Sequence, residues 1–178
     1  MKKMSACGLT VMLLLTLMLS ACQSWYPKAV GLQSAQWQAQ SYHRQDQLEI
    51  QWKNKSFSFL LYQQQQGQSL TMLALSLTGQ PLFQLSFDGK HVQVQQRIDA
   101  LKLLPFEFLV RDILFATYPN FSTLHSADVQ QRQQGDINII QIHQQDVLQI
   151  RRHHTVIDVE NRQVPYRMFF SPVRDLQE

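Results

Sequence analysis

The stretch LPFEFLVRDILFATYP, residues 104–119, decides how the chain is divided into elements. Apolar residues recur in it at the spacing i, i+3, i+4, i+7 and i+8, which is the apolar stripe of a helix. One proline suits the first turn and a second proline ends the element. Glu107 and Arg111 stand one turn apart, where opposite charges attract. Phe108 and Phe115 widen the apolar surface beyond what contact with one sheet usually needs.

On both sides of this stretch, apolar and polar residues alternate, which is typical of half-buried strands. Short polar links between the runs predict antiparallel hairpins. The link at 63–68, five glutamines and one glycine, predicts a hairpin tip that turns at Gly67. The alternating sets are Leu48, Ile50, Trp52; Phe57, Phe59, Leu61; Thr71, Leu73, Leu75, Leu77; Phe83, Leu85, Phe87; Ile140, Ile142; Leu148, Ile150; Ile157, Val159; and Tyr166, Met168, Phe170. Strands before and after one apolar helix predict the α+β class.

The N-terminus has the order of a secretory signal: two lysines, an apolar run of about a dozen residues, and then small residues. A membrane-spanning helix needs ~20 apolar residues, so a permanent span is not expected. LSAC, residues 19–22, resembles a bacterial lipobox. The resemblance implies that residues 1–21 are removed and that acylated Cys22 holds the mature chain to membrane lipid. Gln23 resembles the sorting residue for the periplasmic face of the outer membrane, and simple cleavage without lipidation is the alternative.

Composition limits the remaining possibilities. The mature chain keeps Cys22 as its one cysteine, so its stability must come from a packed core and not from disulfides. Loss of Lys2 and Lys3 lowers the formal net charge from +3 to about +1, which gives no reason to expect a nucleic-acid partner. Residues 22–35 are poorly periodic and predict a tether, and residues 36–178 predict one domain.

Most of the mature chain resembles the LolA/LolB family in the order of its elements. Residues 57–66 and 70–77 resemble two central strands of the family's outer-membrane member, LolB, and residues 104–114 resemble its lid helix. The segment VPYRM, residues 164–168, resembles the approach to a late strand. The resemblance implies an incomplete antiparallel β-barrel, a half-barrel, whose open side is covered by helices and whose interior is an apolar cavity for acyl chains. The chain is also similar to a family of small uncharacterised lipoproteins, for which no activity is established.

The implied site is a cavity without a catalytic group, a metal or another cofactor. We expect its lining to comprise Phe57, Phe59, Leu73, Leu75, Phe83, Leu85, Leu109, Ile113, Met168 and Phe170. In LolB, an exposed leucine in a protruding loop is needed to place the cargo in the membrane. The segment GQPLF, residues 79–83, stands at the comparable turn and makes Leu82 the candidate, although the glycine that follows the leucine in LolB is missing.

The expected function is that of a non-enzymatic outer-membrane lipoprotein that binds acyl chains and hands a lipoprotein or an envelope lipid to the membrane. Its implied partners are that acylated cargo and a LolA-like periplasmic carrier. A sixteen-carbon chain gains roughly 12 kcal/mol on leaving water, at ~0.8 kcal/mol per methylene, which is comparable with its gain in membrane lipid. Similar affinities on the two sides would permit both loading and release.

Two other readings stay open. The same side chains at the same spacing also fit a filled core, which would make the chain an assembly or accessory lipoprotein that works through protein contacts. An enzyme, such as a thioesterase, is the third reading. It has less support, because the histidines are scattered and no Gly-x-Ser-x-Gly turn presents a nucleophile. Asp158 and Glu160, next to Arg162, fit a solvated surface pair better than an acid-base pair.

Overall fold

The alternating runs of the sequence form strands. A computed structural model describes residues 29–124 and 128–173 of the chain. Its strands are β1 (Tyr42–Trp52), β2 (Lys55–Gln66), β3 (Ser69–Leu75), β4 (Pro81–Phe87), β5 (Val92–Arg97), β6 (Val129–Gln134), β7 (Ile137–Ile142), β8 (Gln145–His153), β9 (Val156–Asn161) and β10 (Tyr166–Pro172). Between β5 and β6 lie the 3-10 helix η2 (Asp99–Leu101), the α-helix α2 (Phe106–Thr117) and the 3-10 helix η3 (Phe121–Leu124). The hairpin predicted to turn at Gly67 is confirmed, since it joins β2 to β3.

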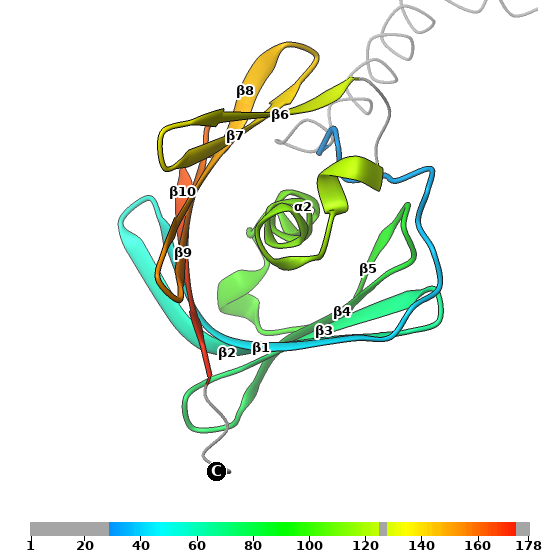
Figure 1. The fold of residues 1–178 in the computed structure, drawn as a ribbon. Coiled ribbons are helices and arrows are strands. Elements are labelled where there is room, and N and C mark those ends of the chain that lie inside the picture. Colours follow the sequence, from blue (N-terminus) through cyan, green and yellow to red (C-terminus); the bar gives the residue numbers. More distant parts are fainter. Residues whose placement is uncertain (1–28, 125–127, 174–178) are drawn as a thin grey trace, which may run out of the picture.

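The ten strands form one antiparallel sheet in the order β5-β4-β3-β2-β1-β10-β9-β8-β7-β6. Two meanders, β1 to β5 and β6 to β10, meet where β1 pairs with β10, and Leu48 stands opposite Phe170 there. Consequently β5 and β6, which are consecutive in the sequence, are the two edges of the sheet. The sheet curls strongly, with one concave and one convex face (Figure 1).

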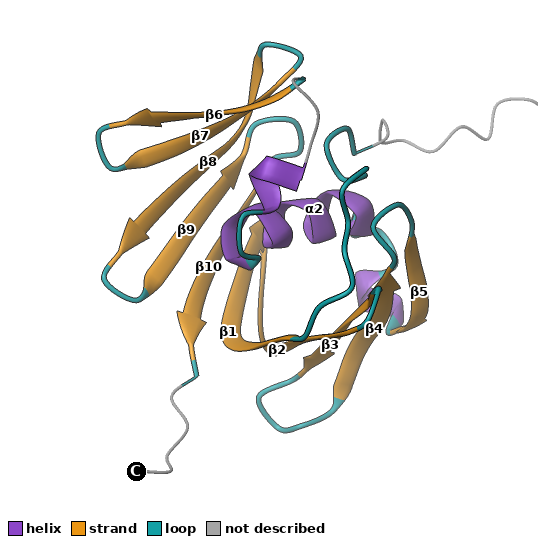
Figure 2. Ribbon diagram, turned by 45° about the vertical axis from the view of Figure 1, so that its right-hand side comes forward, coloured by secondary structure: helices purple, strands orange, loops and turns teal. Residues whose placement is uncertain are grey.

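The helix lies on the concave face because of this topology. The connection from β5 to β6 must run from one edge of the sheet to the other, and it carries α2 across the concavity (Figures 1 and 2). Ten of the twelve residues of α2 are buried, and Glu107 is the exposed one. A helix that is apolar nearly all round is stable only when it is enclosed on most sides. The broad apolar surface of residues 104–119 is therefore explained by the curl of the sheet.

The predicted fold class is wrong. The sequence predicted an α+β half-barrel with helices covering its open side, whereas the described residues form an open ten-stranded antiparallel sheet with the single α-helix α2. The pattern correctly predicted one helix at this position, and the covering helices came from the family resemblance alone. The breadth of the apolar surface of α2 reflects contact with a sheet that curls round the helix.

Residues 29–40 cross the open side of the curled sheet and join its turns. Ser34 N donates to Gly89 O at 2.8 Å, and Gln40 N donates to Gly67 O at 3.1 Å. Ala29, Leu32 and Ser34 are buried, so the packed chain begins before residue 36, where the sequence placed the domain boundary. The predicted signal segment and Cys22 lie outside the described residues. Within the described ranges, no helix has the length and apolar character needed to cross a membrane.

Trp37 anchors this crossing segment. Its ring stacks on Tyr118 at 5.0 Å between centroids and meets Phe87 edge-on at 5.1 Å. Its Nε1 donates to Gln68 O at 2.8 Å. The backbone of Gly89 lies directly against the same ring, with φ +92°, and a Cβ atom there would overlap the ring. Gly89 is thus required both by its backbone angle and by the space around it.

We expect Gly89→Ala to lower the free energy of unfolding by about 2–4 kcal/mol, since it combines an unfavourable positive φ with overlap on Trp37. Gly79→Ala is the matched control, because Gly79 has φ +85° but nothing within 4 Å of an added Cβ. Urea denaturation followed by tryptophan fluorescence measures both variants. Equal losses in the two variants would contradict the packing of Trp37 on Gly89.

Candidate functional site

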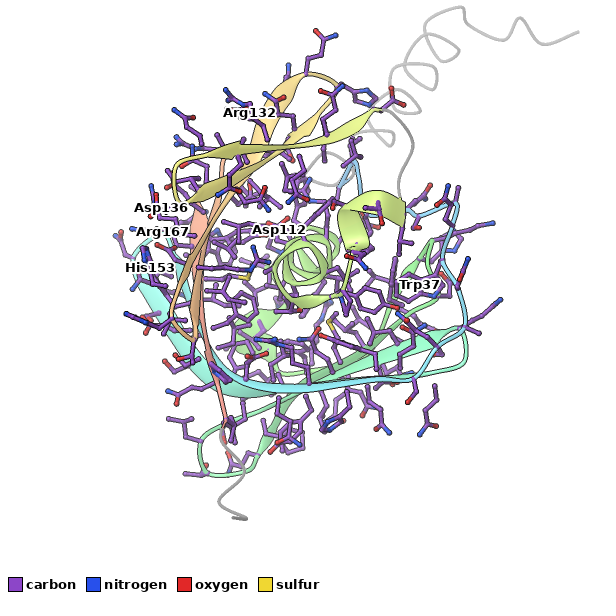
Figure 3. The ribbon with its side chains drawn as sticks, in the orientation of Figure 1. Trp37, Asp112, Arg132, Asp136, His153 and Arg167 are labelled. Atoms are coloured by element: carbon purple, nitrogen blue, oxygen red, sulfur yellow. The ribbon has the colours of Figure 1, made fainter. Side chains whose placement is uncertain are left out.

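The concave face is occupied by the chain's own helix. Of the residues predicted to line a cavity, Phe59, Phe83, Leu85, Met168 and Phe170 are buried on this face and belong to one core cluster with Leu109 and Ile113 of α2. Phe57 is partly buried and packs against that cluster. Figure 3 shows side chains filling the space between α2 and the sheet. The space in which we expected an acyl chain therefore holds α2.

Leu73 and Leu75 do not lie among these residues. In β3 the buried positions are Leu70, Met72 and Ala74, so Leu73 and Leu75 point to the convex face. Every position from 70 to 75 except Thr71 is apolar, and the pattern alone could not tell which set faces inward. A shift of one residue in the choice of face moves the whole set to the other side of the sheet.

Leu82 is the second residue of β4, and it does not stand at a loop tip. It is partly buried and packs against the core, and its carbonyl accepts a hydrogen bond from Ile98 N at 2.9 Å. The exposed leucine at this turn is Leu77, which retains 60% of its accessible surface. The pairing of β3 with β4 is irregular between Ala74 and Leu75, and Leu82 lies next to this irregularity at the start of β4.

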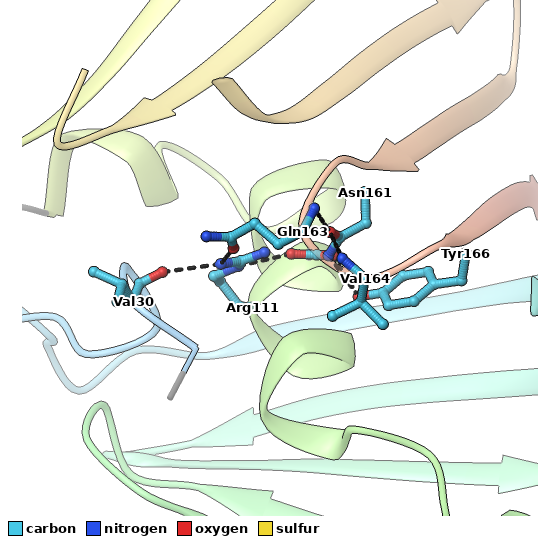
Figure 4. Close-up of polar contacts among 7 residues, drawn as sticks. Val30, Arg111, Asn161, Gln163, Val164 and Tyr166 are labelled. Atoms are coloured by element: carbon cyan, nitrogen blue, oxygen red, sulfur yellow. Dashed lines mark hydrogen bonds and ion pairs between the residues drawn. The ribbon is translucent and has the colours of Figure 1, made fainter. Parts of the chain in front are cut away.

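A buried ion pair sits in the middle of α2. Arg111 and Asp112 both have fully buried side chains, and Arg111 Nε donates to Asp112 Oδ1 at 2.8 Å (Figure 4). The guanidinium also lies over the ring of Phe108, 4.9 Å from its centroid. The sequence suggested Glu107 as the partner of Arg111, but Glu107 is exposed on the helix whereas Arg111 points inward.

Asp112 is held by groups of the sheet. Asn161 Nδ2 donates to Asp112 Oδ2 at 2.5 Å, and the Tyr166 hydroxyl donates to the same oxygen. Asn161 Oδ1 in turn accepts from the backbone N–H groups of Gln163 and Val164, both at 2.7 Å. The carboxylate thus joins α2 to the turn between β9 and β10 (Figure 4).

Arg111 extends the same cluster toward the N-terminal segment. Its Nη1 donates to Val30 O at 3.0 Å and to Gln163 Oε1 at 2.7 Å. The guanidinium of Arg111 therefore connects α2 with two segments that are distant in the sequence, the N-terminal segment at Val30 and the turn between β9 and β10 at Gln163. Nη2 of Arg111 has no hydrogen-bond partner among the described residues.

Burial dominates the electrostatics of this cluster. It raises the pKa of the Asp112 carboxyl above its ordinary value, against the opposing effect of Arg111. Burial also raises the pKa of Tyr166 well above that of a free phenol, and the nearby Asp112 carboxylate adds to the rise. A buried ion pair is costly unless its hydrogen bonds are satisfied, and removal of one partner leaves an uncompensated charge. The cluster is best explained as a device that fixes the position of α2.

A second polar cluster holds the C-terminal end of α2. Thr117 Oγ1 donates to Gln63 Oε1 at 3.2 Å, and the Tyr118 hydroxyl donates to Gln65 Oε1. Tyr42 donates to the carbonyl of Thr117 at 3.3 Å, and Arg152 Nη2 donates to the carbonyl of Ala116 at 2.8 Å. Donors from the sheet thereby satisfy carbonyls that the end of a helix leaves free.

Arg111, Asp112 and Asn161 are buried, whereas Gln163 and Arg152 are exposed. Asn161, Gln163 and Tyr166 also line a hollow at the turn between β9 and β10. No group of three or more His, Cys, Asp or Glu side chains within residues 29–124 and 128–173 could hold a metal ion. Two hollows lie at the surface. One of about 530 Å³ is lined by the crossing segment at Ala29–Gln33, by Val129 of β6 and by Ile142 of β7. The other, of about 590 Å³, lies at the turn between β9 and β10.

Sequence reasoning missed the members of both clusters. Arg111 and Asp112 had a usable signal, because two charged residues interrupt an apolar helix in the middle and leave no polar face for them. Gln63 and Gln65 had none, since they lie in a run of glutamines that was assigned to a hairpin tip. Both are buried, at 0% and 1% exposed. Asn161 and Tyr166 are unremarkable in the sequence and become linked to Asp112 only through the register of β9 and β10.

The fold and its buried polar clusters define a class of β-rich domain in which an open sheet encloses one connecting helix. The chain belongs to the family described as "Protein of unknown function (DUF3261)", whose model matches residues 43–174. The match runs from the second residue of β1 past the end of β10, so it covers the whole sheet and α2. No curated protein matches the chain.

We expect Asp112→Ala to lower the free energy of unfolding by about 3–5 kcal/mol, because it leaves the buried Arg111 guanidinium without its counter-charge. Glu107→Ala on the exposed side of the same helix is the control and should cost less than about 1 kcal/mol. Urea denaturation measures both. Where Asp112→Ala does not fold, Asp112→Asn gives the comparison. A loss no larger than that of the control would contradict the role assigned to the ion pair.

Stability should also fall in alkali. Burial raises the pKa of Tyr42 to about 12, whereas an unfolded phenol ionises near pH 10. Between these values the folded chain holds a proton that the unfolded chain has released, so stability falls as pH rises from 10 toward 12. Thermal melting across this range measures the loss, and Tyr42→Phe should make the slope shallower. An unchanged slope in Tyr42→Phe would contradict the burial of this phenol at the helix end.

Proposed function

We propose that this chain is a non-enzymatic lipoprotein, tethered by acylated Cys22 to the periplasmic face of an outer membrane, whose domain acts through contacts of its outer surface with other proteins. The tether and the location rest on the lipobox-like segment 19–22 and on Gln23. The observation that carries the rest is the helix in the concavity. It supports the reading of a filled core over that of an acyl-chain cavity.

Magnitudes favour the filled core. Seven large apolar side chains of α2 are buried, namely Phe106, Phe108, Leu109, Val110, Ile113, Leu114 and Phe115. At about 1.5–3 kcal/mol each, their exposure would cost about 10–20 kcal/mol. An acyl chain of sixteen carbons gains about 12 kcal/mol at most from the same surface. Displacement of α2 would in addition break the hydrogen bonds of Arg111 and Asp112, so an acyl chain does not offset the loss.

Transfer of acylated cargo is the competing proposal, and it requires α2 to leave the concave face. A fluorescent fatty acid, titrated into residues 22–178 carrying Cys22→Ser, distinguishes the two. We expect no saturable binding at protein concentrations where serum albumin, the positive control, binds the probe fully. Saturable binding with one site per chain would contradict the filled core.

A variant on the convex face separates an interior site from adsorption at the surface. Leu75→Lys changes a partly exposed side chain on the convex face and leaves the core cluster intact. Binding of the fatty acid that survives in Leu75→Lys would come from the interior and would contradict the filled core. Binding that is lost in this variant would come from the convex face and would leave the filled core in place.

A further inference from the structure

One of the two surface hollows lies where the described chain begins. Its walls are formed by the crossing segment at Ala29–Gln33, by Val129 at the start of β6 and by Ile142 at the end of β7. Lys90, in the turn between β4 and β5, and Glu107 of α2 also line it. Segments next to both edges of the sheet therefore meet here. We call this hollow the entry hollow.

The chain is held at a fixed place in the wall of the entry hollow. Arg111 Nη1 donates to Val30 O at 3.0 Å, which ties the segment to α2. Gly31 has φ +81°, and a Cβ atom there would lie 2.4 Å from Ile142 Cδ1, so this position needs glycine. The residues that precede Ala29 in the sequence therefore start from a defined point of the domain.

The wall of the entry hollow is partly apolar and open to solvent. Val30 keeps 42% of its accessible surface, although its backbone is bound by Arg111. Val129 is only partly buried as the first residue of β6. Covering such a wall with another apolar group lowers the free energy, because apolar surface leaves water. The covering group has a space of about 530 Å³ to enter.

The charges of the entry hollow are unequal. The carboxylates of Glu107 and Asp128 line it together with one ammonium group, that of Lys90. Two negative charges and one positive charge leave a formal charge of −1 when His91 and His143, which also line it, are neutral. Among residues 29–124 and 128–173, no side chain pairs with the carboxylate of Glu107. A complementary occupant therefore brings a positive charge together with apolar surface.

A segment with this chemistry directly precedes the entry hollow. Residues 24–28 read SWYPK, with two aromatic residues and a lysine next to Ala29. Trp25 lies four residues before Ala29, so their Cα atoms are within about 14 Å of each other. A short attachment of this kind gives the segment an effective concentration on the order of millimolar at the hollow. Pro27 restricts itself and the residue before it, which reduces the entropy lost on docking.

We propose that residues 24–28 fold back over the entry hollow. The ring of Trp25 covers the apolar wall at Val30 and Val129, and the ammonium group of Lys28 lies near the carboxylate of Glu107. Chain connectivity selects this occupant, because the segment is joined to the wall of the hollow and carries both the aromatic surface and the positive charge that the hollow lacks.

Docking of this segment shortens the tether. The seven residues from Cys22 to Ala29 span at most about 25 Å, whereas the three from Cys22 to Trp25 span at most about 11 Å. The entry hollow is then held close to the membrane. In both ribbon views the start of the described chain and β3 lie at opposite ends, so β3 points away from the membrane (Figures 1 and 2). This orientation rests on the proposed function, because it needs an acylated Cys22.

Fluorine NMR of 5-fluorotryptophan tests the docking of Trp25. Residues 22–178 carrying Cys22→Ser contain three tryptophans, and the signal of Trp25 is the one that is lost in Trp25→Phe. We expect this signal to lie away from its position in the urea-unfolded chain. Glu107→Lys sets a like charge against Lys28 and should move the signal of Trp25 toward the unfolded position. Val129→Lys, which places a cation in the apolar wall, should do the same.

Asp136→Lys is the matched control. It makes the same change of charge as Glu107→Lys, but at the turn between β6 and β7, which is the end of that hairpin away from Val129 and Ile142. The signal of Trp25 should stay in place in this variant. The other two tryptophan signals report whether each variant is folded, and Glu107→Lys keeps the test decisive if Val129→Lys does not fold, because Glu107 is exposed.

Two results would overturn the inference. A Trp25 signal at the unfolded position in the parent chain would leave the entry hollow to a separate molecule. A displaced signal that neither Glu107→Lys nor Val129→Lys moves would place the ring elsewhere on the domain. The test uses an unlipidated chain, so it does not depend on the tether. Mass spectrometry of the chain extracted from membranes measures acylation of Cys22 separately, and its absence would count against the proposed function and not against docking.

Discussion

The structure depends on one topological constraint: the two strands that are joined by the helical connection are the two edges of the sheet. β5 and β6 follow each other in the sequence, but eight strands separate them in the sheet. Their connection runs from one edge of the sheet to the other, and it carries α2 across the concave face. Enclosure of α2 follows from this, and so do the curl of the sheet round it and the all-round apolar character of the helix. The core is single because both meanders pack on the same helix.

Burial of the connection removes polar groups of α2 from water, and the two clusters supply most of the hydrogen bonds that these groups need. Arg111 and Asp112 satisfy each other, and the turn between β9 and β10 supplies most of their remaining hydrogen bonds. Glutamines of β2 and the hydroxyl of Tyr42 do the same for the C-terminal end of the helix. Apolar packing alone would allow α2 to shift or rotate on the apolar concave face of the sheet. Buried polar contacts of fixed geometry select one position, because every alternative leaves a charge unpaired.

Local elements could be predicted from the sequence, whereas their assembly could not. Periodicity indicated the strands and the bounds of α2, because 2.0 and 3.6 residue repeats are local properties of the chain. The inward face of β3 was misassigned because Leu70, Met72, Leu73, Ala74 and Leu75 offer apolar residues to both faces. The filling of the concavity depends on the order of strands, which no local pattern contains. The candidate site was the least predictable part, since Asp112, Asn161 and Tyr166 come together only through that order of strands.

The central claim is that α2 is a permanent part of the core, and native-state hydrogen exchange of its backbone amides tests this most directly. If the helix leaves only when the whole domain unfolds, the amides of Ile113 and Leu114 exchange as slowly as those of Leu48 in β1 and Met168 in β10. Their exchange then has the same dependence on denaturant. Exchange of the α2 amides through a smaller opening, while the amides of β1 and β10 stay protected, would contradict the account and favour a helix that yields its place to a ligand.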